Sequence, residues 1–147
     1  MWYNLGRMSS VSETGLTKNY RLVYEIVREQ VRGTHLAPAD VFALAKTKHK
    51  GIGFTTVYRA LARLRELGLV SEISLPGAQS AYYEPAWPAH AHFRCDTCGR
   101  IEDVDYALSS EVVDGLARKH RLTVHDVSIS LHGTCRQCTD RVSSPAG

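Results

Sequence analysis

The cysteines of this chain form two Cys-x-x-Cys pairs, Cys95 with Cys98 and Cys135 with Cys138, and the sequence contains no others. Two such pairs are typical of a zinc site in which four thiolates surround the ion and leave no open position. Residues 99–134 separate the pairs, which is room for a strand, a helix and a strand. We therefore predict a structural Zn²⁺ site without a catalytic role, and disulfides are the alternative.

Two histidines, His90 and His92, stand directly before the first cysteine pair. On a strand, residues two apart point to the same side. With the acidic Glu84 and Asp103 nearby in the sequence, they form either a second metal site or an ordinary group of polar residues. Histidine and carboxylate ligands without a thiolate suit Fe²⁺, Mn²⁺ or Zn²⁺.

The first half of the chain must position part of this chemistry, and its apolar periodicity predicts helices over 18–33, 38–45 and 55–67. An alternating strand over 69–75, a Pro-Gly turn and a return strand over 81–84 follow. Three helices and a hairpin are the plan of a winged helix-turn-helix domain, whose third helix enters the major groove of DNA.

Charge favours DNA as the partner of this half. Residues 1–88 carry 11 Lys+Arg against 7 Asp+Glu, whereas residues 89–147 carry 7 against 8. The third helix presents Tyr58 and Arg59, which suit base contacts, although a solvated basic face is the alternative. Three further residues suit contacts with the DNA backbone: Thr56, Arg63 and Lys18. The basic linker over 46–53 is either a surface loop or another phosphate contact.

The second half begins after the stiff connector Pro85-Ala86-Trp87-Pro88. Its pattern predicts strands over 91–95, 101–104 and 122–131, a helix from Ser109 or Ser110 to His120, and a loose tail after Cys138. The fold class is therefore α+β, with a winged helix-turn-helix domain and a small α/β domain holding the four cysteines. We place a flexible arm at 1–14, the DNA-binding domain at 15–84, a hinge at 85–89 and the metal-binding domain at 90–147.

The composition predicts the cell compartment. No apolar run approaches the roughly 20 residues that a membrane span needs, and no secretory signal opens the chain. We expect a cytoplasmic protein with reduced thiols and no membrane partner.

Several motifs of this sequence, in order from about residue 15 to 138, resemble the ferric uptake regulator family. They are Thr55-Thr56-Val57-Tyr58-Arg59, Leu67-Gly68-Leu69-Val70, His90-Ala91-His92-Phe93-Arg94-Cys95-Asp96-Thr97-Cys98-Gly99 and Gly133-Thr134-Cys135-Arg136-Gln137-Cys138. The resemblance implies a homodimeric, metal-dependent repressor that binds a double-stranded DNA operator, with the second domain dimerising. It implies neither an enzyme nor a small organic substrate.

The resemblance also implies a regulatory metal site that draws ligands from both domains. The corresponding residues here are His35, Glu84, His90, His92 and Asp103, with Glu102 as the alternative to Asp103. Metal bound by such a set closes the hinge and fixes the spacing of two recognition helices across a dimer.

The identity of the regulatory metal remains open between branches of the family. Asp103 resembles peroxide sensors, in which bound Fe²⁺ reacts with hydrogen peroxide and a ligating histidine is oxidised, whereas Glu84 departs from them. Iron or manganese sensing and peroxide sensing therefore stand side by side. A zinc uptake regulator is the alternative within the family, although the cysteine that many of those place near the end of the wing is missing.

The sequence also departs from the family's pattern. Ala89 and Ala91 stand where many members have a further metal site, although Glu111 and His125 remain nearby. The first helix opens with Thr17-Lys18-Asn19-Tyr20 where Thr-Pro-x-Arg is common, so we expect Lys18 or Arg21 to replace the contact of that arginine. From another class, a zinc hydrolase or deaminase using His90, His92 and a carboxylate is the rival. It lacks the His-x-Glu and Pro-Cys-x-x-Cys pattern of deaminases.

Overall fold

The computed structural model describes residues 15–144 of the 147-residue chain. The arm expected at 1–14 lies outside the described residues. The described part forms two compact units: a helical unit (residues 15–74 and 78–87) and a sheet unit (residues 75–77 and 88–144). Among the described helices, none is long and apolar enough to cross a membrane.

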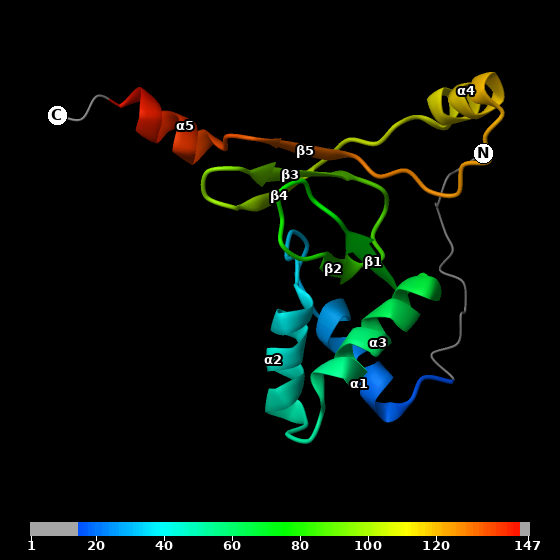
Figure 1. Cartoon of the computed structure of the whole chain (residues 1–147), viewed down its shortest axis with the longest axis vertical. Coiled ribbons are helices and arrows are strands. Elements are labelled where there is room, and N and C mark those ends of the chain that lie inside the picture. The colour runs from blue at the N-terminus through cyan, green and yellow to red at the C-terminus, as the bar shows by residue number, and fades with distance from the viewer. Residues whose placement is uncertain (1–14, 145–147) are drawn as a thin grey trace. The chain divides into compact units, whose positions relative to one another are not determined.

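The helical unit contains α1 (Lys18–Arg28), α2 (Pro38–Lys48) and α3 (Phe54–Glu66), shown in Figure 1. Apolar residues at helical spacing on these three helices share one core, in which the fully buried side chains include Val23, Val27, Val41, Ala45, Val57, Leu61 and Leu64. The first helix ends at Arg28, before the predicted 33, and Val31, which was expected on its apolar face, is 75% exposed.

A hairpin completes the helical unit, with β1 (Val70–Ile73) antiparallel to β2 (Tyr82–Pro85). The loop between α1 and α2 also lies along β2: Leu36 and Tyr83 exchange backbone hydrogen bonds of 3.0 and 2.7 Å. The sequence pattern did not predict this bridge. It brings His35, the residue before Leu36, beside Glu84, the residue after Tyr83.

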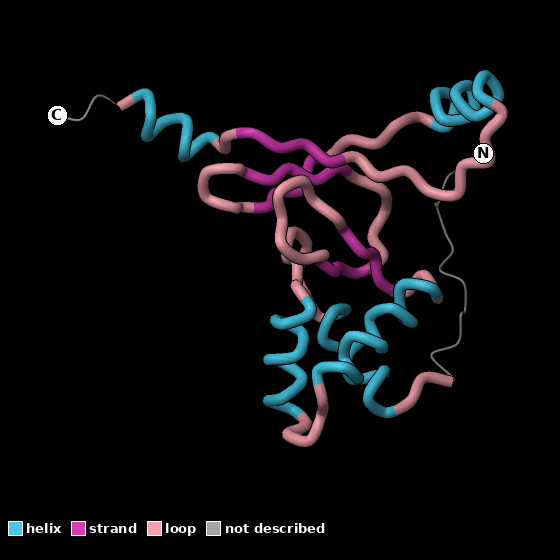
Figure 2. Tube along the Cα trace, viewed as in Figure 1, coloured by secondary structure: helices cyan, strands magenta, loops and turns pink. Residues whose placement is uncertain are grey.

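The sheet unit is built on three strands, with β3 (Ala91–Cys95) in the centre. β4 (Ile101–Val104) is antiparallel to β3, and β5 (Ser130–Gly133) is parallel to it (Figure 2). The helix α4 (Ser110–His120) begins as predicted, because the Ser109 hydroxyl accepts a hydrogen bond from the Val112 N–H at 3.4 Å.

Three sequence expectations for the sheet unit are wrong in part. The strand expected over 122–131 covers only Ser130–Gly133, because β3 offers partners only from His92 to Cys95. The expected inward stripe of α4 is largely exposed: Val113 is buried, but Val112 and Leu116 are 47% and 49% exposed. The tail is not loose, since the helix α5 (Arg136–Ser143) begins inside the second cysteine pair.

Candidate functional site

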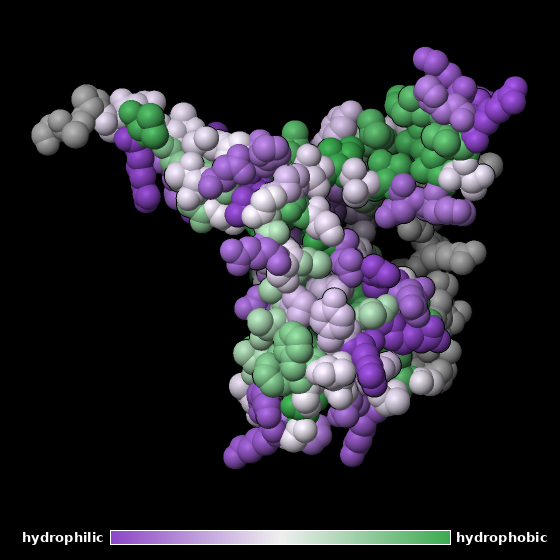
Figure 3. All heavy atoms as spheres, viewed as in Figure 1, coloured by the Kyte–Doolittle hydropathy of each residue, from purple (hydrophilic) through white to green (hydrophobic). Residues whose placement is uncertain are grey.

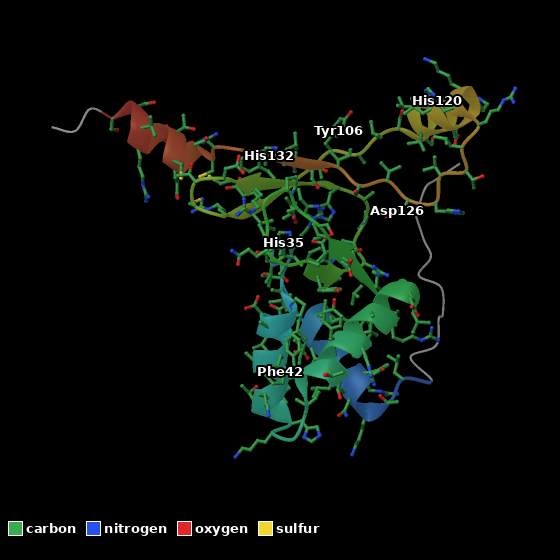
Figure 4. The ribbon with its side chains drawn as sticks, in the orientation of Figure 1. His35, Phe42, Tyr106, His120, Asp126 and His132 are labelled. Atoms are coloured by element: carbon green, nitrogen blue, oxygen red, sulfur yellow. The ribbon has the colours of Figure 1, made fainter. Side chains whose placement is uncertain are left out.

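The four cysteines converge at one end of the sheet unit. Cys95 ends β3, Cys98 closes the following turn, and Cys135 and Cys138 lie before and in the first turn of α5. Their sulfur atoms all lie within 4.8 Å of one another, and Figure 4 shows sulfur (yellow) beside α5.

The spacing of the sulfurs fits zinc. The Sγ atoms of Cys98 and Cys135 are 3.8 Å apart, about the separation expected around a tetrahedral ion with Zn–S bonds of about 2.3 Å. A disulfide needs about 2.05 Å, and all four thiols are free. The disulfide alternative is therefore wrong for this structure.

Backbone N–H groups favour the thiolate form of one of the four cysteines, Cys95. The N–H of Cys135 donates to Cys95 Sγ at 3.3 Å. This N–H and that of Cys98 lower the pKa of Cys95 to about 6, whereas the hydrogen bond with Cys135 and burial raise the pKa of Cys138 to about 12. A bound cation would favour the thiolate form of every ligand.

Polar contacts tie the two cysteine segments together outside the cluster. The N–H of Asp96 donates to the carbonyl of Gly133 at 2.7 Å, and the Asp96 carboxylate lies 3.0 Å from His132 Nδ1. Arg100 donates to the side-chain oxygen of Gln137 at 2.7 Å. The turn from Cys95 to Cys98, which we call the first knuckle, is therefore held by polar contacts to the chain before and after Cys135.

The helical unit holds one histidine–carboxylate pair. His35 Nε2 lies 3.5 Å from Glu84 Oε2, and both side chains are only 3% exposed. The bridge between Leu36 and Tyr83 accounts for this pairing, because His35 and Glu84 are the next residues along the two paired segments. We call these two residues the helical half-site; Figure 4 labels His35.

The sheet unit holds a second group, the sheet half-site, made of His90, His92 and Asp103. Asp103 faces His92 directly across β3 and β4, and its Oδ1 atom lies 3.5 Å from His90 Nε2 and 3.7 Å from His92 Nε2. The two imidazole centroids are 4.5 Å apart. The prediction that both rings point to one side is therefore confirmed by the geometry of this unit.

The contact with Pro88 aims one of these rings. His90 Nδ1 lies 2.8 Å from the carbonyl oxygen of Pro88, so that Nε2 faces Asp103. Histidines that bind metals commonly use one ring nitrogen for such a contact and the other for the ion. Glu102, the alternative to Asp103, is exposed and pairs with Arg100 at 3.6 Å.

Both half-sites offer imidazole nitrogen and carboxylate oxygen and contain no thiol, which fits Fe²⁺, Mn²⁺ or Zn²⁺. The structure does not gather Glu111 and His125 with other ligands: among the described residues, neither belongs to a group able to bind a metal.

The outer face of α3 presents the residues expected to meet DNA. Tyr58 is 56% exposed, and the exposed Arg59 forms no ion pair with any residue that the structure describes. Arg63 pairs with Glu66 at 3.2 Å. Thr56 is half-buried, and Lys18 is exposed as the first residue of α1.

Sequence reasoning missed one residue on this face. Phe54 is the first residue of α3 and is 46% exposed, and its ring centroid lies 6.3 Å from that of Tyr58. The available signal was its position four residues before Tyr58, which places both on one side of a helix.

Comparison with known proteins gives a consistent answer. The profile of the Ferric uptake regulator family matches residues 13–132. The Ferric uptake regulation protein of Bacillus subtilis is 33% identical over 110 residues, covering 73% of this chain and 74% of that protein. The Peroxide operon regulator of the same organism is 26% identical over 136 residues, covering 91% and 92%.

A solved structure agrees with these sequences. The crystal structure of the Campylobacter jejuni peroxide stress regulator superimposes with a TM-score of 0.66 and 28% identity, covering 82% of this chain and 88% of that one. The chain belongs to the ferric uptake regulator family, which consists of metal-dependent transcriptional regulators and not of enzymes.

Proposed function

We propose that this protein is a homodimeric repressor whose binding to operator DNA depends on a divalent metal. The observation that carries this proposal is the pair of half-sites, each with histidine and carboxylate groups prepared within its own unit. In this reading the helical unit is a winged helix-turn-helix domain, the sheet unit is the dimerisation domain, and residues 85–89 are the hinge.

The regulatory site in this proposal combines His35 and Glu84 with His90, His92 and Asp103 around one ion. Alone, the helical half-site offers two ligand side chains and the sheet half-site three, fewer than the six positions of an octahedral ion such as Mn²⁺. An ion that takes ligands from both favours the arrangement in which they meet. That preference is the differential affinity through which metal changes DNA binding.

The four cysteines would hold a structural Zn²⁺. The ion would join the end of β3 to the start of α5, and with four thiolates it keeps no position open for a substrate. Its place is next to the sheet half-site, since Cys95 and His92 both belong to β3.

Exposed apolar residues support dimerisation through the sheet unit. More than a third of the surface is exposed at each of four such residues: Val112 and Leu116 on α4, Val127 before β5 and Leu131 in β5. Figure 3 shows hydrophobic residues gathered over α4. Val112 and Leu116 are four residues apart and so lie on one side of α4, and exposed apolar patches of this kind mark protein interfaces.

DNA would be read by α3. Tyr58 and Arg59 would contact bases, with Thr56, Arg63 and Lys18 on the backbone. Replacing Arg59 with Ala removes a base contact, so operator affinity should fall roughly 5- to 150-fold with zinc content unchanged. Arg118→Ala in α4 is the matched control; equal affinity of the Arg59→Ala and Arg118→Ala proteins would remove Arg59 from the interface.

Metal sensing and peroxide sensing remain the two inducer hypotheses. Asp103, and not Glu102, faces both histidines, which favours the resemblance to peroxide sensors, while the relative of 33% identity is a Ferric uptake regulation protein. An Fe²⁺ ion at this site would supply one electron to hydrogen peroxide. His35, His90 and His92 would hold the ion beside their own oxidisable imidazole rings.

The experiment that tests the function measures operator affinity of the protein loaded with Fe²⁺, Mn²⁺ or Zn²⁺, each with and without hydrogen peroxide. Loss of binding only with iron and peroxide, with a +16 Da change on His35, His90 or His92, supports peroxide sensing. Metal-dependent binding without oxidation supports metal sensing. If no divalent ion changes the affinity, the regulator proposal fails.

A further inference from the structure

Three aromatic side chains form a row on the helical unit, and the DNA contacts proposed above use only one of them. Phe42 on α2 meets Phe54 edge-on, with centroids 5.5 Å apart and planes at 78°. Phe54 in turn lies 6.3 Å from Tyr58. We call Phe42, Phe54 and Tyr58 the aromatic row; Figure 4 labels Phe42 on α2.

The outer two members of the row lie outside the buried core, since Phe54 and Tyr58 are 46% and 56% exposed. Phe42 is partly buried and packs against the core, which anchors the inner end of the row. The usual apolar contact at a helix start joins the residue before the N-cap with the fourth helical residue. Ile52 and Val57 occupy these places and are buried, so Phe54 is not needed to start α3.

Positive charge surrounds the row. The Lys46 ammonium lies 5.5 Å from the centre of the Phe42 ring, Lys50 is exposed in the following loop, and Arg59 is exposed next to Tyr58. An apolar patch bordered by cations suits a polyanion that also carries apolar groups. In duplex DNA, the thymine methyl group is the apolar feature of the major groove.

On the basis of the proposed function, we infer that Phe54, held in place by Phe42, reads thymine methyl groups beside Tyr58. As the first residue of α3, Phe54 lies at the end of a recognition helix that contacts base edges. Its ring has no hydrogen-bonding group, so it discriminates by apolar contact: it favours thymine over bases without a methyl group in the major groove. Phe54 is thus a specificity-determining residue, and Phe42 is its positioning residue.

The test removes the methyl group and the ring separately. An operator is first selected from random duplexes with the Mn²⁺-loaded wild-type protein. Each thymine is then replaced with deoxyuridine, one position at a time, in both symmetric halves of the operator. The wild type should lose roughly three- to fivefold in affinity per methyl at the contacted position, the value of one buried methyl-sized group. Phe54→Ala should bind the original operator more weakly and be insensitive to deoxyuridine at that same position.

Two further variants sharpen the result. Phe54→Leu keeps an apolar contact and should retain part of the methyl sensitivity. Val31→Ala, which shortens another exposed apolar side chain outside α3, should behave as wild type. Zinc content and melting temperature establish that each variant is folded.

The inference and the proposed function fail differently. If the wild type selects no operator with any metal, the regulator proposal fails and the inference with it. If the wild type selects an operator, but the Phe54→Ala protein and the wild type lose the same factor in operator affinity at every deoxyuridine position, Phe54 does not read thymine. The regulator proposal then stands.

Discussion

His90 and His92 take their common orientation from particular neighbours. His90 lies directly before β3 and His92 lies on it, Asp103 lies opposite His92 on β4, and the Pro88 carbonyl orients the His90 ring. The spacing could be predicted from the sequence. Residue types and spacing alone do not choose between Asp103 and Glu102, and the prediction of Asp103 came from the family resemblance. The choice depends on the register between β3 and β4, because a shift of one residue would exchange the two carboxylates.

The cysteine cluster gives the residue-scale prediction. Cys138→Ser removes one of four thiolates, and the remaining three leave an open, weaker site. We expect zinc content measured by mass spectrometry to become substoichiometric, and the melting temperature of the protein to fall, because metal binding contributes to folding.

Thr97→Ser is the matched control for this change, since Thr97 lies in the same knuckle between Cys95 and Cys98. It should keep stoichiometric zinc. A Cys138→Ser protein that retains its zinc against a chelator would contradict the four-thiolate site.

The β1–β2 hairpin is held together at the element scale by a side-chain contact. The Tyr83 hydroxyl donates to Glu72 at 2.7 Å, and Tyr83 is 4% exposed. Burial and the nearby Glu72 carboxylate raise the pKa of Tyr83 above its usual range, so the hydroxyl remains a donor. Because Tyr83 also pairs with Leu36, this contact supports the segment that carries His35 and Glu84.

Tyr83→Phe removes the hydroxyl and leaves the Glu72 carboxylate without this donor. The free energy of unfolding should fall by about 1.5 kcal/mol, the value of a hydrogen bond to a charged group. Tyr82→Phe, one residue earlier on β2 and without a hydroxyl hydrogen bond among the described residues, is the control. Equal denaturation midpoints for the two variants would show that the contact contributes nothing.

Elements with local signals were predictable, and those that depend on distant partners were not. The strand at Ile101–Val104 follows from its place directly after the turn that holds the first cysteine pair, and the start of α4 at Ser110 follows from the Ser109 cap. The Leu36–Tyr83 bridge has no local signal because its partners are far apart in the chain. Likewise, α5 begins between the two cysteines of the second pair, and its mostly polar sequence lacks the apolar periodicity that would predict a helix.

At the scale of the whole molecule, two residues of α4 that were expected to be buried are exposed, and a second copy of the chain is the partner that we propose for them. Val112 and Leu116 have the spacing of a buried helix face but are exposed, which is the pattern expected if a second copy covers them. The burial predicted from the amphipathic sequence of α4 is therefore wrong for Val112 and Leu116 in the single chain, and the proposed dimer would account for it.

Leu116→Glu places a charge in this face, and burying an unpaired carboxylate is strongly unfavourable. We expect the variant to sediment as a monomer at concentrations where the wild type is a dimer, with the Cys-bound zinc retained. Val31→Glu, an exposed apolar position in the helical unit, should remain dimeric. A dimeric Leu116→Glu protein would place the interface elsewhere.

The most direct test of the regulator is a Mn²⁺ titration of operator affinity for the wild type, His35→Ala, His92→Ala and the control His132→Ala. His35 and His92 belong to different units, while His132 pairs with Asp96 outside both half-sites. If one ion joins the half-sites, His35→Ala and His92→Ala should each abolish the metal-dependent gain in affinity, and His132→Ala should keep it. A full metal response in either of the first two variants would contradict a shared regulatory site.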